Sequence, residues 1–139
     1  LILRTFAASI LPIPFVLPLP AAVAVARWTG GAVAISGEED LITDGRQLVF
    51  SQGGSEMMPC ITGTGCSLGG VMAVYAAVAD PFIAAIYRLC RSITWAGTRA
   101  AAHAKGTGSF QTEFHRRTLC GNARCDCPEP IDCRGGIIS

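Results

Sequence analysis

The stretch Thr62–Leu68, TGTGCSL, places two glycines directly ahead of an apolar segment with helical spacing. The apolar residues of that segment recur three and four positions apart: Leu68, Val71, Met72, Tyr75 and Val78. This spacing predicts a helix over 67–79, and Asp80 and Pro81 end it. Glycine lacks a Cβ and adopts backbone conformations that other residues avoid. The stretch therefore requires a fold in which a tight loop leads into the N-terminus of a helix.

The sequence on either side of this loop predicts a strand, a hairpin and further helices. AVAIS at 32–36 is a short apolar run typical of a buried strand, and Asp44 and Gly45 between β-rich arms predict a hairpin over 41–50. Two further helices are predicted from apolar spacing: 82–105 and 110–119. One strand and one hairpin are too little sheet for so many helices to cover. The chain is therefore expected to be part of a larger α/β unit.

Composition and charge exclude several kinds of partner. Half of the 139 residues are hydrophobic (50%), only 15% are charged, and the net charge is +1. This balance does not favour a nucleic-acid surface or a polybasic membrane surface, so we expect small molecules or other protein chains as partners. The seven cysteines show no disulfide-framework spacing over the main body of the chain. We therefore expect a reducing, cytoplasmic location.

The N-terminal segment 1–26 is patterned differently. It has one arginine, a long apolar run and small residues at its end, which is the layout of a secretory signal. Its four prolines argue against a regular membrane-spanning helix. Because the chain does not begin with methionine, we expect that it starts inside a longer one.

The C-terminal segment 120–139 is rich in cysteine and has no hydrophobic period. The four thiols available for a zinc site are Cys120, Cys125, Cys127 and Cys133. Structural zinc sites usually use two separated Cys-x2–4-Cys pairs, a spacing that is absent from this segment. An unstructured tail is the favoured interpretation, and zinc binding is the alternative.

Histidines and acidic residues elsewhere suggest no metal site. His103 and His115 stand alone on predicted helices, so we expect partly exposed side chains without a ligand role. The acidic run 38–40 follows the predicted strand, and we expect a solvated loop there. No metal ligand is assigned in the chain.

The glycine loop has the chemistry of an anion site. The first backbone N–H groups of a helix have no partners within the helix, and together with the positive end of the helix dipole they attract phosphate. The same dipole favours the thiolate form of a cysteine placed there, so Cys66 could accept a proton from an attacking hydroxyl or hold that hydroxyl. A small buried side chain is the alternative for Cys66. A dinucleotide fingerprint fits poorly, because no clear parallel strand precedes the loop and the third glycine, Gly69, is displaced.

Three ordered runs carry a resemblance to a known family: GAVAISGEEDLITDGRQLVF (31–50), GGSEMMPCITGTGCSLGGVMAVYAAV (53–78) and AGTRAAAHAKGTGSFQTEF (96–114). Together they resemble hydroxyethylthiazole kinase, a thiamine-salvage enzyme of the ribokinase-like fold. The similarity runs from near Ala21 to about Leu119 and corresponds to roughly the C-terminal half of that family. It implies a partial ribokinase-like, three-layer α/β domain over 21–119, between an unmatched Pro-rich segment at 1–20 and a disordered Cys-rich tail at 120–139.

The resemblance also implies roles for individual residues. Cys66 matches the family's catalytic base position, where related kinases have aspartate. Gly63 matches a glycine that contacts the thiazole alcohol, and Ser36 matches a threonine that contacts ATP. The amides of Thr64, Gly65 and Cys66 would then form an anion hole for the γ-phosphoryl group.

The implied activity is ATP-dependent phosphorylation of 4-methyl-5-(2-hydroxyethyl)thiazole, with Mg²⁺ required and an active site between the subunits of a homotrimer. Magnesium ligands and an ATP-contacting arginine are expected outside this chain, which would then be inactive alone. Pro59 and Cys60 stand where the family commonly has threonine and lysine. Because proline removes an N–H donor and fixes φ, we expect this difference to affect the backbone that leads into the loop. The alternative from another class is a non-catalytic, truncated relative that acts only as a phosphate-binding or interaction fragment.

Overall fold

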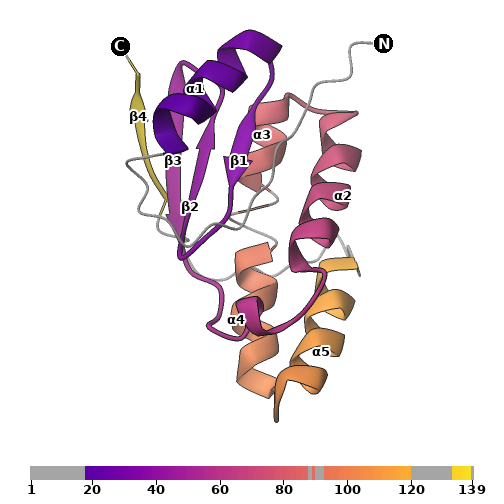
Figure 1. The fold of residues 1–139 in the computed structure, drawn as a ribbon. Coiled ribbons are helices and arrows are strands. Elements are labelled where there is room, and N and C mark those ends of the chain that lie inside the picture. Colours follow the sequence, from indigo (N-terminus) through magenta and orange to yellow (C-terminus); the bar gives the residue numbers. More distant parts are fainter. Residues whose placement is uncertain (1–17, 88, 90–92, 120–132, 139) are drawn as a thin grey trace.

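The computed structural model of the chain describes residues 18–87, 89, 93–119 and 133–138 (Figure 1). Its helices are α1 (Pro18–Thr29), the 3₁₀ helix η1 (Met58–Cys60), α2 (Thr64–Ala76), α3 (Pro81–Ile86), α4 (Thr94–His103) and α5 (Thr107–Leu119). Its strands are β1 (Val33–Ile35), β2 (Glu39–Thr43), β3 (Gln47–Gln52) and β4 (Cys133–Ile137). The strands form one sheet in the order β1-β2-β3-β4, and each neighbouring pair is antiparallel.

The sheet is the middle of three layers. Helix α1 lies on one face, α2 and α3 lie on the other, and the α4–α5 pair extends beyond one end of the sheet (Figure 1). Successive side chains of a strand point to opposite faces, and β2 follows this rule. Leu41 packs with Ala26 of α1, whereas Ile42 packs with Met72 of α2. Both faces of β2 are therefore buried.

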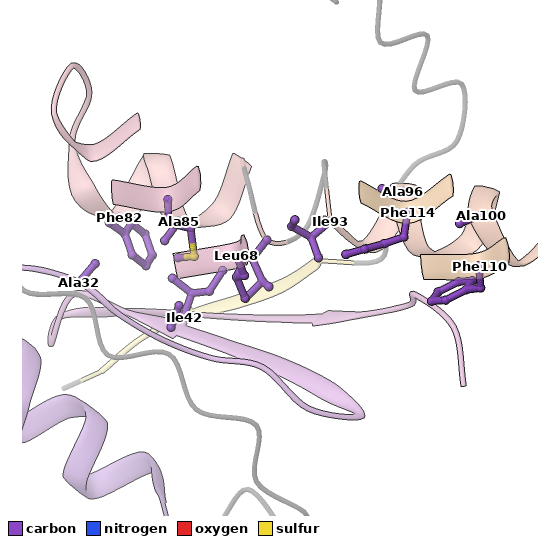
Figure 2. Packing of buried hydrophobic residues seen from close by; sticks show 13 residues of the cluster. Ala32, Ile42, Leu68, Phe82, Ala85, Ile93, Ala96, Ala100, Phe110 and Phe114 are labelled. Carbon is purple, nitrogen blue, oxygen red and sulfur yellow. The ribbon is translucent and has the colours of Figure 1, made fainter. Parts of the chain in front are cut away.

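The larger hydrophobic cluster joins the sheet to α2–α5 (Figure 2). Phe110 and Phe114 of α5 are fully buried and stack with ring centroids 6.0 Å apart. Ala96 and Ala100 of α4 are fully buried beside them, and their small side chains let the two helices approach closely. The predicted final helix over 110–119 is confirmed, although α5 already begins at Thr107.

The hairpin predicted at Asp44 and Gly45 is confirmed as β2–β3. Asp44 Oδ1 accepts hydrogen bonds from the amides of Arg46 (2.7 Å) and Gln47 (2.6 Å), which closes the turn. Gly45 has φ +88°, and a Cβ added there would lie 2.6 Å from Cγ of Arg27. Both the backbone conformation and the contact with α1 therefore require glycine at this position.

The segment 82–105, expected as one helix, is described as α3 and α4. Residues 88 and 90–92 between them lie outside the described residues. Ile83, one of the apolar residues whose spacing predicted this helix, is 58% exposed. Phe82 and Ala85 of α3 pack in the larger hydrophobic cluster instead.

The first and last described segments also show regular structure. Helix α1 begins at Pro18 and buries Ala22 and Ala26 against the sheet. Strand β4 pairs with β3, with Arg134 opposite Phe50, which differs from the expected unstructured tail. The edge of β3 supplies that pairing, and a local sequence pattern does not reveal such a contact. Across the described ranges, none of the helices is long and apolar enough to cross a membrane.

Candidate active site at the start of α2

Helix α2 begins at the glycine loop without a side-chain cap. Gly63 occupies the N-cap position with φ +92°, a left-handed conformation that favours glycine, and no side chain of the described residues caps the helix there. The first helical hydrogen bond runs from Ser67 N to Gly63 O (2.9 Å). The amides of 64–66 therefore precede the helical ladder, and Cys66 is exposed beside them. The structure thus brings together four of the predicted site positions, 63–66.

Helices α4 and α5 hold this loop in place. Gln111 Nε2 donates to the carbonyl of Thr62 (3.1 Å), directly before the loop. Further ahead in the chain, before η1, the carbonyl of Gly54 accepts from Thr98 Oγ1 (3.1 Å). A Cβ added at Gly97 would lie 2.7 Å from Met58 Sδ, so the absence of a side chain lets η1 lie against α4. The loop is thus attached to the α4–α5 pair through its backbone.

Pro59 and Cys60 fit this approach to the loop. Pro59 lies in the first turn of η1, where its missing N–H has no partner to lose. The Cys60 amide donates to Met57 O (3.1 Å) and that of Ile61 to Met58 O (3.4 Å). The departure from the family pattern therefore does not disrupt the backbone before Gly63.

Ser36 lies directly after β1, and its side chain is partly buried. The turn between β1 and β2 and the start of α2 lie at the same end of the sheet (Figure 1). The described structure therefore places the predicted ATP-contacting segment and the glycine loop at one end of the domain.

Asp40 is a further polar residue at this end, and the sequence interpretation missed it. The expected solvated loop is wrong for Asp40, which is 8% exposed in β2, while Glu38 is exposed. Burial raises the pKa of Asp40 to about 7, with a smaller raising effect from Glu39 and a lowering effect from the Gly37 amide. The local sequence gives no clear signal of this burial, because only the strand register places Asp40 on the same face as the buried Ile42.

Metal ligands do not come together in this part of the molecule. Within the described ranges, no three His, Cys, Asp or Glu side chains form a group that could hold a metal ion. His103 is exposed, and its Nδ1 lies 2.9 Å from the carbonyl of Arg99. The partly buried His115 packs edge-on against Phe114 at 5.6 Å. Cys120, Cys125, Cys127 and the thiol of Cys133, the proposed zinc ligands, lie outside the described residues.

A cavity of about 550 Å³ lies at the opposite end of the sheet. Its charged lining residues are Arg27, Asp44, Arg46 and Asp80. These charges balance, and both carboxylates already accept backbone hydrogen bonds. The cavity contains none of the predicted site residues, so we place the candidate site at the glycine loop.

Three kinds of comparison agree on what the chain resembles. The sequence profile of the hydroxyethylthiazole kinase family matches residues 16–118. The hydroxyethylthiazole kinase of Bifidobacterium animalis subsp. lactis is 52% identical over 85 residues, which cover 60% of this chain and 27% of that protein. The hydroxyethylthiazole kinase of Leptospira interrogans is 42% identical over 96 residues, which cover 69% of this chain and 36% of that protein.

The solved structure of hydroxyethylthiazole kinase from Pyrococcus horikoshii matches with a TM-score of 0.73 and 25% identity. The match covers 84% of this chain and 45% of that one, which confirms the predicted partial ribokinase-like α/β fold. The chain spans about a third of the length of the curated relatives it matches. Because the family profile covers most of its residues, the chain belongs to the hydroxyethylthiazole kinase family.

Proposed function

We propose that the full-length protein containing this chain transfers a phosphoryl group from ATP to the hydroxyl of 4-methyl-5-(2-hydroxyethyl)thiazole, in thiamine salvage. The observation that carries the proposal is the uncapped start of α2, where a glycine in the left-handed conformation precedes three amides and an exposed thiol. Its relatives named hydroxyethylthiazole kinase support the choice of substrate.

The loop suits phosphoryl transfer because that reaction depends mainly on positioning and on neutralising charge. In the proposed mechanism, the amides of Thr64, Gly65 and Cys66 donate to the oxygens of the transferring group, where negative charge is concentrated. These donors are fixed by the backbone, so they need not reorganise during the reaction. The tethers from α4 and α5 support the proposal, since they fix the loop without occupying its amides.

Cys66 is the proposed general base. Its thiolate would accept the proton of the thiazole alcohol as the alcohol oxygen attacks the γ-phosphorus, while ADP leaves on the opposite side. Gly63 is proposed to contact that alcohol, and the absence of a side chain there leaves room for the substrate. Among the described residues, no atom lies within 4 Å of a Cβ built on Gly63, so the space at this position is open.

Ser36 is the proposed contact for ATP, since it directly follows β1 and the turn between β1 and β2 lies at the glycine-loop end of the sheet (Figure 1). Mg²⁺ is proposed as a requirement of the full-length protein, because ATP reacts in proteins as a magnesium complex. The described residues do not supply a set of ligands for this ion. Family membership further supports a homotrimer in the cytoplasm as part of the proposal.

The test is ADP release by the full-length protein with ATP, Mg²⁺ and the thiazole alcohol. We expect ADP to appear only when the thiazole alcohol is present, with the phosphate recovered on its hydroxyl. Phosphorylation of a different primary alcohol in its place would overturn the substrate assignment. ATP binding without transfer to any alcohol would instead favour the alternative of a non-catalytic, phosphate-binding relative.

A further inference from the structure

A pair of buried polar side chains lies beneath the turn between β1 and β2. Asp40 of β2 and Ser51 of β3 are directly opposite in the antiparallel register, and they are 8% and 1% exposed. Their neighbours Ile42 and Val49, two positions along each strand, pack in the cluster between the sheet and α2–α5. Asp40 and Ser51 therefore face the same, helix-covered side of the sheet.

One oxygen of Asp40 is bonded to the turn. Oδ1 accepts a hydrogen bond from the amide of Gly37 at 3.2 Å. This amide belongs to the peptide group that also contains the carbonyl of Ser36, and a peptide group is planar. The bond therefore fixes the orientation of the backbone on the C-terminal side of Ser36.

The other polar group of the pair is the Ser51 hydroxyl. Ser51 Oγ is buried and lacks a hydrogen-bond partner among the described residues. Burial raises the pKa of Asp40 to about 7, so the carboxyl group carries a proton below about pH 7. An apolar pair would fill this space without such desolvation, so stability alone does not account for the two residues.

We propose that Asp40 is a positioning residue for ATP binding: through the Gly37 amide, it holds the turn that carries Ser36. The inference rests on the proposed function, in which Ser36 contacts ATP.

Strand β2 offers a matched control, because an aspartate closes the turn at each of its ends. Asp44 accepts from the amides of Arg46 and Gln47 at the hairpin end, away from the glycine loop. A purely structural role would make Asp40→Ala and Asp44→Ala behave alike. Asp40→Asn serves as the rescue variant, since its amide oxygen still accepts from the Gly37 amide.

The experiment measures KM for ATP and for the thiazole alcohol, together with ATP Kd by calorimetry, in full-length variants. Asp40→Ala is expected to raise KM and Kd for ATP about tenfold, the effect of one lost hydrogen bond to a charged or strongly polar group. KM for the thiazole alcohol should stay within about twofold. Asp40→Asn should restore ATP affinity. Asp44→Ala should lower Tm but leave ATP affinity unchanged.

Unchanged ATP affinity in Asp40→Ala, or an Asp40→Asn variant as weak as Asp40→Ala, overturns the positioning role. If Asp40→Ala does not fold, Asp40→Ser replaces it with the same expected result, since serine is too short to reach the Gly37 amide. The calorimetric Kd needs no turnover. A protein that binds ATP with this dependence on Asp40 but does not phosphorylate the thiazole alcohol would therefore contradict the proposed function alone.

Discussion

Two consecutive helices of this fold begin in opposite ways. Helix α3 begins at Asp80, whose Oδ1 accepts from the amides of Phe82 (2.9 Å) and Ile83 (3.3 Å). Helix α2 begins at Gly63, and none of the described side chains caps it. A cap satisfies the free amides of a helix, so the α3 start is complete within the chain. The difference indicates that the start of α3 has only a structural role, whereas the first amides of α2 remain available to an anion.

The same contrast holds between the two turns that flank β2. Burial raises the pKa of Asp44, but the amides of Gln47 and Arg46 outweigh it, so the pKa of Asp44 is lowered overall. At the glycine-loop end, burial dominates and the pKa of Asp40 is raised to about 7. Backbone amides at the hairpin end favour the ionised form of Asp44, whereas burial at the glycine-loop end disfavours the ionised form of Asp40. The uncapped start of α2 and the buried carboxyl group of Asp40 both cost stability, and both lie at the end proposed to bind ATP.

The largest expected effect comes from removing the thiol. In the full-length protein, Cys66→Ala should lower kcat by roughly 10²- to 10⁴-fold, the usual contribution of a positioned base. ATP Kd should change little, because a base acts in the transition state. Steady-state kinetics and calorimetry check the two halves of this prediction.

Cys66→Asp is the matched variant for this experiment. Aspartate is also a base and occupies this place in related kinases, so much of the activity should return. Full activity of Cys66→Ala would show that the thiol is structural. The difference between the starts of α2 and α3 would then not be evidence for catalysis at α2.

The next effect concerns stability against pH. Folded Asp40 keeps its proton up to about pH 7, whereas the unfolded chain loses it near pH 3.8, the ordinary pKa of an aspartate. Between these values the folded state binds more protons, so the free energy of unfolding falls as pH rises, by up to about 1.4 kcal/mol per pH unit. Asp40→Asn should remove this contribution, as denaturant unfolding from pH 4 to 8 would reveal.

Asp44→Asn is the control from the other turn. Its carboxylate has a lowered pKa, so its contribution to stability is present above pH 3.8 and is lost as the solution becomes more acidic. Below about pH 4, the stability difference between wild type and this variant should therefore shrink as the pH falls, whereas the Asp40 contribution declines as the pH rises from 4 to 7. If both aspartates gave the same trend, the two ends of β2 would not differ as described.

Removing the α3 cap should have a smaller effect. Asp80→Ala is expected to lower the free energy of unfolding by about 1 kcal/mol, the usual effect of a lost N-cap. ATP affinity should be unchanged, since the capped helix is proposed to have no ligand. Asp80→Asn keeps an acceptor and should recover most of the stability in chemical denaturation. A clear loss of ATP binding in Asp80→Ala would place both helix starts in one site.

The smallest effect is expected at the loop tether. Gln111→Ala removes the hydrogen bond to Thr62 O, which is exposed, so the free energy of unfolding should fall by only about 0.5 kcal/mol. The KM for ATP should rise slightly because the loop is held less firmly. Gln111→Glu is an informative comparison: its carboxylate cannot donate to the carbonyl and should behave like alanine.

The sequence predicted those parts of the fold that local chemistry determines. Asp44 and Gly45 are sufficient for the hairpin, because the turn is closed by bonds within a few residues. The pairing of β4 with β3 and the packing of α1 depend on distant partners, and no local pattern encodes them. The same limit applies to Ile83, whose exposure depends on how α3 sits against the sheet.

The same distinction between local signals and distant contacts applies to the candidate site. The glycine loop and Cys66 follow from two glycines ahead of a helix, which is a local signal. Ser36 was proposed from family resemblance, since a serine after a strand has no distinctive pattern. Asp40 was missed because three consecutive acidic residues look solvated, and only the strand register reveals that the third is buried.

The most direct test follows the backbone amides of both helix starts by NMR while ATP is added to the full-length protein. The amides of Thr64, Gly65 and Cys66 should shift in a saturable way, because they are the proposed donors to the phosphate oxygens. The amides of Phe82 and Ile83 serve as internal controls, since Asp80 already accepts their hydrogen bonds, and they should not shift. Saturable shifts at α3 with none at α2 would contradict the claim that the uncapped start of α2 is the phosphate site.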